Sequence, residues 1–400
     1  MLIKNFQKLK VFKIILILII SGCSKEFQEK NFSIPDWKMP EQSSNHQKIY
    51  FAIYGSVFEP QEHLETKQYQ EGKSISFKVG GKEALKEYLA ILKKRFPQNL
   101  ISISTGALIN PSKDIAQTTL DLQFLKELSP DITHFNYKDL ASLANEKREL
   151  KETKINFNIN LINSNVIDHK NNEIYLPLNA VSEKVINIYN QKMAFLSINY
   201  AQDTETKQLI ALPGLIHQDP ILTILKAKEK LKAQGIHSFI LLANIHSNCR
   251  SVVDFKKYHS FEFMENTELH CDEDDPLLKL VKRLPPHVVD AIILTNTNEN
   301  QNNKFLLGSL NEIPIVKLDE SGKYILLTEM SYDLTRFRAD KKKFSFWPPI
   351  KLCEEFILST QDCYINEFEA LPTILKIDRP SELALIPAKF LGFEISNSKL

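Results

Sequence analysis

The stretch GGKEALKEYLAILKKRFPQNLISISTG, residues 80–106, joins a helix pattern directly to a strand pattern. Apolar side chains recur along residues 80–96 at the spacing of an amphipathic helix, and residues 99–106 are typical of a strand that ends in glycine. The apolar face of the helix comprises Ala84, Leu85, Tyr88, Leu89, Leu92 and Phe96. A helix followed at once by a strand indicates an α/β protein, in which helices cover a sheet.

The same alternation extends outward in both directions. Further strands are expected at 48–56, 238–244 and 290–296, and further helices at 114–128, 220–235 and 275–285. The last helix has Asp275 at its N-cap, and the acidic run before it is favourable charge at a helix start. Two late strands, 313–319 and 324–333, are expected to pair with each other. Sites in such folds lie at the carboxyl ends of strands, so the residues that follow each strand are the candidates.

The N-terminus has the pattern of an export signal. Four lysines precede the apolar run 14–20, which is too short to span a membrane, and Ser21-Gly22-Cys23 follows. This order resembles a bacterial lipobox, which predicts a lipoprotein signal peptide over 1–22, acylation of Cys23 and a polar tether over 23–47. An ordinary signal peptide with a chance cysteine is the alternative. Ser24 after the cysteine, by resemblance to Gram-negative lipoproteins, favours the outer membrane, with the protein facing the periplasm or the cell surface.

Composition excludes some classes of function. The formal net charge is +1 with both signs mixed along the chain, so nothing suggests a nucleic-acid partner. The chain contains only 11 glycines and neither of the common glycine-rich nucleotide-binding motifs, so a phosphate-cradling loop is not expected.

The cysteines support export. Four remain besides Cys23, and an even number in an exported chain suggests two disulfides, most simply Cys249–Cys271 and Cys353–Cys363. Sequence alone does not fix this pairing. A zinc site built from His246, Cys249, His270 and Cys271 is the alternative, although ligands at adjacent positions diverge on most backbones.

The order of these segments resembles the 5'-nucleotidase-type branch of the calcineurin-like metallophosphoesterases. In that family, strand ends read D-x-H, G-D, G-N-H-[ED], L-S-H and G-H-x-H, and their side chains hold two divalent metals. The resemblance covers residues 48 to about 335 and implies a two-sheet αββα sandwich over 48–340. Only a short C-terminal appendage, 341–400, remains where the family's nucleotidases carry a long substrate domain.

The frames around these motifs are present, but the metal ligands are not. Matching the frames places apolar or neutral residues where the family has acids and histidines, with Lys138 in place of an acid. The degenerate positions are Ile53, Gly55, Ala107, Asn136, Tyr137, Asn244 (or His246 after a two-residue shift), Asn296 and Asn298. The segment PGLIHQDP offers His217 and Asp219 as ligands in another alignment, although a polar loop is the simpler interpretation.

This substitution pattern argues against a metal pair. Two divalent cations a few ångströms apart repel each other, and anionic ligands must offset that charge. Amide oxygens and alkyl groups supply no such charge, so we expect no metal cofactor and no catalytic residue.

The expected function is therefore a membrane-anchored envelope lipoprotein whose domain is catalytically inactive and acts as a binding or interaction module. Its partner would be a small polar ligand or another envelope protein. The alternative is an active phosphoesterase resembling the 5'-nucleotidases, which would need a dinuclear divalent metal site.

Overall fold

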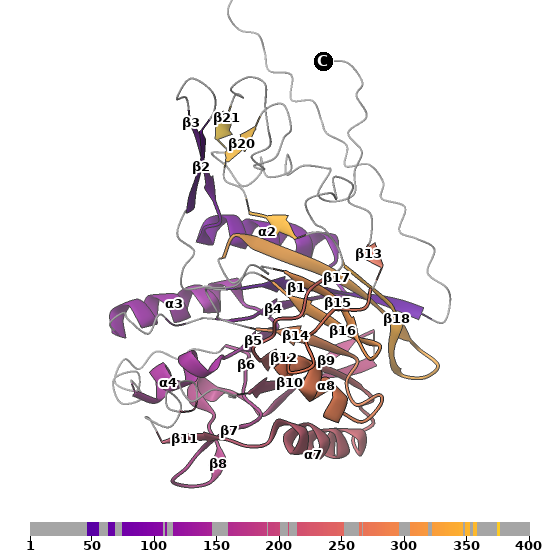
Figure 1. Cartoon of the computed structure of the whole chain (residues 1–400). Coiled ribbons are helices and arrows are strands. Elements are labelled where there is room, and N and C mark those ends of the chain that lie inside the picture. The colour runs from indigo at the N-terminus through magenta and orange to yellow at the C-terminus, as the bar shows by residue number, and fades with distance from the viewer. Residues whose placement is uncertain are drawn as a thin grey trace, which may run out of the picture. The chain divides into compact units, whose positions relative to one another are not determined.

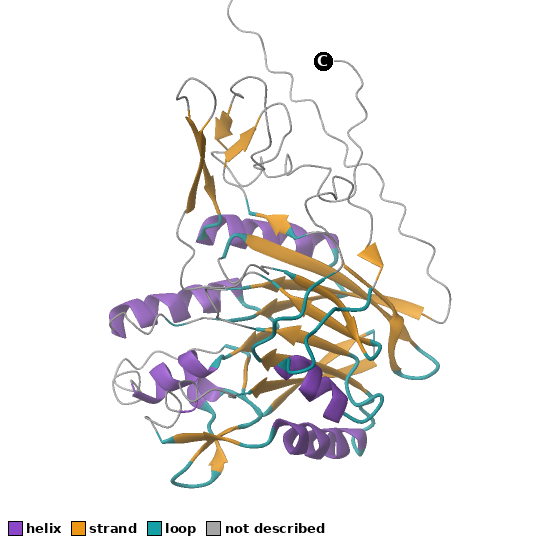
Figure 2. Ribbon diagram, viewed as in Figure 1, coloured by secondary structure: helices purple, strands orange, loops and turns teal. Residues whose placement is uncertain are grey.

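The computed structural model has an α/β architecture with several sheets, as Figure 1 shows by element and Figure 2 by type of secondary structure. It describes residues 46–55, 63–68, 74–106, 109, 115–145, 159–189, 191–200, 207, 214–251, 264–265, 267–295, 305–318, 322–346, 349–352, 355–357 and 374–376. No helix within these ranges has the length and apolar character that crossing a bilayer requires.

The larger sheet has eight strands with the first strand near its centre. Its order is β13 (Met264–Glu265), β18 (Arg338–Phe346), β17 (Tyr324–Asp333), β1 (His46–Tyr54), β4 (Leu100–Ser104), β5 (Ile132–His134) and β6 (Leu161–Ile162), with β19 (Ile350–Lys351) beside β17. From β1 to β6 the strands are parallel, whereas β17 is antiparallel to β1. The parallel strands therefore all end at one edge, which we call the carboxyl edge, and begin at the opposite amino edge.

The second sheet has six strands. Its order is β15 (Leu306–Leu310), β16 (Ile313–Lys317), β14 (Ala291–Leu294), β12 (Ser238–Asn244), β10 (Gln191–Asn199) and β9 (Glu183–Ile188). The four inner strands are parallel, and the two outer strands run antiparallel to their neighbours. A predominantly parallel sheet needs cover on both faces, which the other layers of the fold provide.

The two sheets pack face to face, and helices cover their outer faces (Figure 1). Alternate residues of β1 enter the core between the sheets, where Phe51 packs edge-on against Phe195 of β10. The intervening Tyr50 stacks on Phe96, at the end of α2 (Lys82–Arg95). α3 (Ile115–Leu128) lies beside α2, while α7 (Pro220–Lys232) and α8 (Pro276–Arg283) cover the second sheet. The predicted two-sheet αββα sandwich is confirmed.

Smaller elements complete the described part of the chain. A three-stranded sheet contains β11 (Leu215–His217), β7 (Val166–Asp168) and β8 (Glu173–Ile174). Two hairpins pair β2 (His63–Gln68) with β3 (Ser74–Val79), and β20 (Glu355–Ile357) with β21 (Ile374–Lys376). The remaining helical elements are α4 (Tyr137–Asn145) and a 3₁₀ turn, η2 (Pro177–Asn179).

Two expectations about the end of the domain need correction. The late strands β16 and β17 do not pair with each other, because β16 joins β14 and β15 while β17 pairs with β1. The boundary expected at residue 340 falls inside β18, whose pairing with β17 continues to Phe346. At the other end, β1 begins at His46, so the tether expected to reach residue 47 stops short of it.

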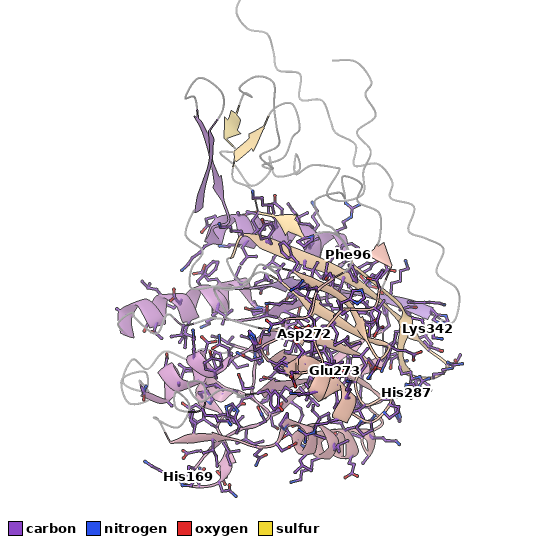
Figure 3. All side chains as sticks on the ribbon, in the orientation of Figure 1. Phe96, His169, Asp272, Glu273, His287 and Lys342 are labelled. Atoms are coloured by element: carbon purple, nitrogen blue, oxygen red, sulfur yellow. A yellow bond between two sulfur atoms is a disulfide. The ribbon has the colours of Figure 1, made fainter. Side chains whose placement is uncertain are left out.

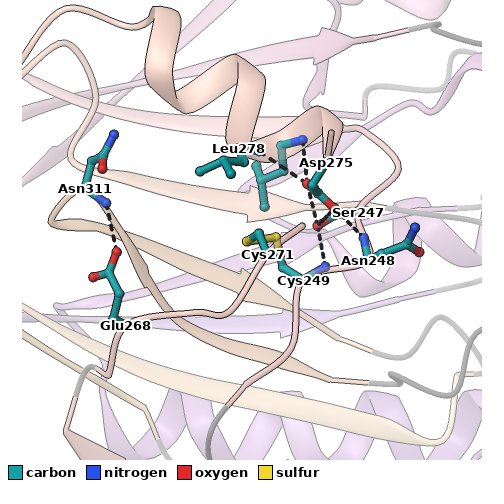
Figure 4. The surroundings of a disulfide bond; sticks show 9 residues. Ser247, Asn248, Cys249, Glu268, Cys271, Asp275, Leu278 and Asn311 are labelled. Carbon is teal, nitrogen blue, oxygen red and sulfur yellow. Dashed lines mark hydrogen bonds between the residues drawn. A yellow bond between two sulfur atoms is a disulfide. The ribbon is translucent and has the colours of Figure 1, made fainter. Parts of the chain in front are cut away.

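A disulfide joins Cys249 to Cys271, as expected, with a Cα–Cα separation of 4.1 Å (Figure 4). Beside it, the backbones of Arg250 and His270 exchange two hydrogen bonds. Both sulfurs of this pair are bonded to each other, so they offer no thiolate to the alternative zinc site. Cys353 and Cys363 lie outside the described residues.

The disulfide secures the loop that follows β12 against the start of α8. Asp275, the N-cap of α8, accepts hydrogen bonds from the backbone N–H groups of Leu277 and Leu278, as its position predicted. The same carboxylate also accepts from the backbone N–H of Asn248 at 2.6 Å and from the hydroxyl of Ser247 at 3.2 Å (Figure 4). Cap and disulfide together fix a loop that leaves the carboxyl edge.

Removing this disulfide is expected to lower the free energy of unfolding by about 3 kcal/mol, because it closes a loop of 22 residues in sequence. Urea unfolding of the Cys249→Ala/Cys271→Ala variant, with and without reductant, measures the effect. The variant should unfold at lower urea and respond less to the reductant than the native chain, which should shift toward the variant when reduced. Equal stability of the two proteins would show that the bond contributes nothing.

Candidate functional site

Hydrogen bonds join the two sheets at the carboxyl edge. His134, the last residue of β5, lies 2.6 Å from the hydroxyl of Ser197 through its Nδ1. Two residues further along β10, the amide of Asn199 donates to the carbonyl of Phe135 at 3.1 Å. The backbone N–H of Ser164, just after β6, donates to the carbonyl of Ser197. The ends of β5 and β6 from one sheet therefore meet the end of β10 from the other.

Asn199, Asn244 and Thr295 form a row across the ends of β10, β12 and β14. Asn199 and Asn244 are partners in the parallel register, and the register of β12 with β14 continues to Thr295. Leu242 and Ile293, two residues earlier on their strands, belong to the core between the sheets. Since side chains alternate along a strand, the row also faces the space between the sheets.

The row carries polar atoms that have no hydrogen-bond partner among the described residues. They are Oδ1 of Asn199, Nδ2 of Asn244 and Oγ1 of Thr295, and all three residues are buried. Buried polar groups are almost always hydrogen-bonded, so each such atom needs an explanation. Three such atoms side by side on neighbouring strands are expected of a site whose polar ligand would form the missing hydrogen bonds.

Asn136 occupies the family's asparagine position, but its oxygen is already engaged. It is the residue before α4, and its Oδ1 accepts the backbone N–H of Asp139 at 2.9 Å. The carboxylate of Asp139 in turn accepts the backbone N–H groups of Asn136 and Ile109. This reciprocal capping box leaves only Nδ2 of Asn136, a buried donor without a described partner. The side chain therefore presents a hydrogen-bond donor where a metal ligand must present a lone pair.

The first strand contributes no ligand. Ile53 is 1 % exposed and lies in the apolar core between the sheets, with Ile103 and Leu326 as its register partners. Gly55, the buried residue just after β1, has no side chain to offer. Ala107, expected in place of the bridging aspartate, lies outside the described residues. An alkyl group, a hydrogen atom and a methyl group thus stand where the resemblance places three ligands.

The other predicted positions divide into two groups. Tyr137 is the first residue of α4 and is half-buried, and His246 is a half-buried residue of the loop after β12. Asn296 and Asn298 lie outside the described residues, immediately after the row residue Thr295. The structure therefore places Asn136 and Asn244 at the same edge and leaves the position of the asparagine pair open.

Two buried imidazoles adjoin the amides. Burial lowers the pKa of His134 to about 3, and its Nε2 has no described partner. Burial likewise lowers the pKa of His217 to about 4, which outweighs the opposing effect of the Asn199 backbone. The ring of His217 thus lies close to the Asn199 backbone, but neither of its buried nitrogens makes a well-aligned hydrogen bond with a described residue. Each ring is therefore neutral at pH 7 and able to donate from one nitrogen and accept at the other.

The polar-loop interpretation of His217 and Asp219 is corrected in part. His217 ends β11, which pairs with β7. Asn165, next to β7, donates to the carbonyls of both Asn199 and Gln218, which brings β11 to the amide row. Asp219 is the N-cap of α7 and pairs with Arg283 at 3.0 Å. The Asp-Pro helix start was a usable signal, and the sequence offered His217 as an alternative ligand, whereas nothing local marked Asn199.

We call Asn136, Asn199, Asn244, Thr295, His134 and His217 the carboxyl-edge cluster. The cluster is uncharged, and the one described carboxylate in contact with it belongs to Asp139 and is occupied by backbone N–H groups. A pair of divalent cations needs anionic ligands and accessible lone pairs. The donor set of this cluster does not fit such a metal pair. It fits uncharged groups that both donate and accept hydrogen bonds.

No protein-family model and no curated protein sequence matches the chain. Among solved structures, NAD nucleotidase (NadN) of Haemophilus influenzae is similar with a TM-score of 0.53 and 13 % identity, over 85 % of this chain and 55 % of that one. The 5'-nucleotidase precursor of Thermus thermophilus is similar with a TM-score of 0.50 and 13 % identity, over 76 % of this chain and 55 % of that one. The sulfate thiohydrolase SoxB of Thermus thermophilus is similar with a TM-score of 0.50 and 10 % identity, over 79 % and 58 %.

These similarities define the fold. The chain has the fold of a metallophosphoesterase. It is the calcineurin-like fold of the 5'-nucleotidase type, as the sequence frames predicted. The chain spans little more than half the length of these three solved structures.

Proposed function

We propose that this protein is a lipid-anchored envelope protein whose metallophosphoesterase-like domain binds a small uncharged polar ligand and does not hydrolyse phosphate esters. The observation that carries the proposal is the carboxyl-edge cluster. In it, buried amide, hydroxyl and imidazole atoms without described partners collect at the edge where this fold class places its chemistry.

The cluster favours a ligand that donates and accepts. Nδ2 of Asn136 and Nδ2 of Asn244 donate, Oδ1 of Asn199 accepts, and the hydroxyl of Thr295 does either. A phosphate monoester would bring charge into a site without a described cation, which is costly. Polyols, sugars and nucleobases present matched donors and acceptors without charge. The anchor part of the proposal rests on the lipobox pattern at Cys23.

Metal analysis and a phosphodiesterase assay of the purified, dialysed chain test the proposed absence of phosphate-ester hydrolysis. After incubation with manganese we expect no stoichiometric metal and no turnover of a generic phosphodiester, because the positions that should hold metal supply apolar groups and donors. A matched preparation of an active nucleotidase of the same fold is the positive control. Two metal ions per chain together with turnover would establish the alternative, an active phosphoesterase.

The ligand class is tested on the same preparation. Thermal unfolding with a panel of nucleosides, sugars and polyols should reveal a compound that raises the melting temperature by a few degrees at saturating concentration. Asn244→Ala should abolish that shift, whereas Asn171→Ala, at an exposed turn between β7 and β8, should leave it unchanged. If no compound in the panel shifts the melting temperature, the proposal that the protein binds these classes of ligand is wrong.

A further inference from the structure

The amino edge of the sandwich is basic. Each helix that follows a parallel strand runs back toward this edge, so the last turns of α2 and α3 lie there, with Nζ of Lys93 in hydrogen-bond contact with the carbonyl of Ser129. The basic residues of these turns and of the end of α7 are Lys93, Lys94, Arg95, Lys126, Lys230 and Lys232. Among them Lys230 pairs with Glu183, and Glu127 in the last turn of α3 pairs with Lys86. Basic side chains suit a helix C-terminus electrostatically, and here several such ends collect on one side.

The segment around the β17–β18 turn adds the largest net positive charge. Residues 333–343 contain five basic side chains (Arg336, Arg338, Lys341, Lys342 and Lys343) and two acidic ones (Asp333 and Asp340). The segment therefore carries a formal charge of +3, whereas the whole chain carries only +1. Figure 3 shows Lys342 on the side of the molecule away from His169, which lies in the turn between β7 and β8.

The tip of this turn presents an exposed aromatic ring. Phe337 is 50 % exposed, between Arg336 and Arg338, at a positive backbone φ of 52°. The carboxylate of Asp333 accepts hydrogen bonds from the backbone N–H groups of Thr335 and Arg336, and from the Thr335 hydroxyl. These bonds fix the turn, so Phe337 is held outward by the backbone. An exposed phenylalanine among arginines and lysines is the side-chain combination of a surface that lies at a membrane interface.

The tether enters the fold beside this turn. His46, the first residue of β1, is the register partner of Asp333, the last residue of β17. A chain anchored through Cys23 therefore reaches the domain at the base of the turn, with at most 22 residues between the acylated cysteine and β1. Tethering keeps this edge close to the bilayer, which raises its effective concentration at the lipid surface.

We propose that the amino edge, with Phe337 at its tip and Arg336, Arg338, Lys342 and Lys343 around it, docks onto an anionic phospholipid bilayer. The basic side chains contact lipid phosphates, and the Phe337 ring enters the boundary between headgroups and acyl chains. The orientation of the domain that this docking gives rests on the proposed anchor at Cys23. The attraction between the surface and anionic lipid does not.

The test places a fluorescent reporter at the tip. The Phe337→Trp variant, made in the full-length lipidated chain and reconstituted on vesicles, should be quenched by brominated phospholipid when the vesicles contain an anionic lipid. Quenching should fall at 1 M salt, where the screening length is about 3 Å. The native Trp37 and Trp347 provide a background that is measured in the unsubstituted chain. Leu222→Trp is the matched control, because Leu222 is 57 % exposed but lies at the start of α7 near the carboxyl edge.

Charge variants separate electrostatic docking from simple proximity. Arg336→Gln with Lys342→Gln, added to the Phe337→Trp variant, should lower the docking equilibrium roughly thirtyfold, since each basic residue near an anionic surface contributes about fivefold. Lys279→Gln, on α8 and paired with Asp274, should leave it unchanged. If the reporter indole remains unquenched, or if the charge variants and neutral vesicles behave like the native chain on anionic ones, the proposal is overturned.

Two further outcomes distinguish failure of the proposed lipid anchor from failure of the proposed docking surface. Absence of acylation at Cys23 would refute the proposed anchor, while quenching of the Phe337→Trp reporter by added anionic vesicles would still support the docking surface. Binding of a soluble polyanion such as heparin, with the reporter unquenched on vesicles, would instead identify a site for charged polymers and refute membrane docking.

Discussion

Replacing Ile53 by aspartate is expected to lower the free energy of unfolding by more than about 4 kcal/mol, or to prevent folding. The family resemblance of the sequence implies a metal-binding aspartate at this position. Here the side chain is 1 % exposed and packs in the apolar core between the sheets. A carboxylate introduced there would lose its water and would find no described cation to pair with.

Urea unfolding measures this effect, and Ile53→Val is the control. Valine removes one methylene and should cost about 1 kcal/mol, which separates loss of packing from burial of a charge. Ile53→Asn is a second control, because it introduces polarity without charge and should fall between the two. An Ile53→Asp variant that keeps its stability and binds manganese would show that the side chain lies in a metal site and not in the core.

Acidification is expected to destabilise the protein through its two buried histidines. Both have a pKa lowered by burial, to about 3 for His134 and about 4 for His217. In the unfolded chain each titrates near pH 6.5, so below that pH the unfolded state binds protons that the folded state does not. The stability is therefore fully present above pH 6.5 and is lost as the pH falls toward 4. Lowering the pH from 7 to 4.5 should cost about 2–3 kcal/mol for His134, and a similar or smaller amount for the less buried His217.

Urea midpoints at several pH values test this dependence. The window from pH 6.5 to 5 is diagnostic, because most carboxylates titrate below it. A variant with His134→Gln and His217→Gln should have a flatter profile in this window than the native chain. The ring signals of His134 and His217 in the native protein, followed by NMR, should not titrate above pH 5. If the urea midpoints of the native and variant proteins changed with pH in parallel, His134 and His217 would not be the cause of the acid destabilisation.

The sequence patterns predicted the layers of the fold but not every neighbour within a sheet. Amphipathic helices and apolar strands carry their own periodicity, so the α/β class and the Asp275 cap followed from local patterns, whereas the two-sheet αββα sandwich was implied by the family resemblance. The expected pairing of β16 with β17 failed, because both are apolar strands and nothing in either one identifies its partner. Strand pairing depends on contacts between segments far apart in the chain, which local patterns do not encode.

The same limit applies to the candidate site. Asn136 and Asn244 follow strands and were predicted, His217 was named only as a ligand in an alternative alignment, and Asn199 was not predicted. Asn199 becomes part of the cluster only because its register partner, Asn244, lies 45 residues later in the chain. The orientation of the Asn136 side chain could have been predicted from the sequence. An asparagine three residues before Asp139 at the start of a helix is a capping pattern.

The nine residues of β1 run from the tether at the amino edge to the carboxyl edge. At a rise of about 3.3 Å per residue, this strand spans roughly 30 Å. A domain docked by its amino edge would therefore hold the carboxyl-edge cluster nearly four screening lengths of about 8 Å above the lipid phosphates at physiological salt. Ligands would reach the cluster from the aqueous side, and their affinity for it should not depend on the anionic lipid content of the membrane.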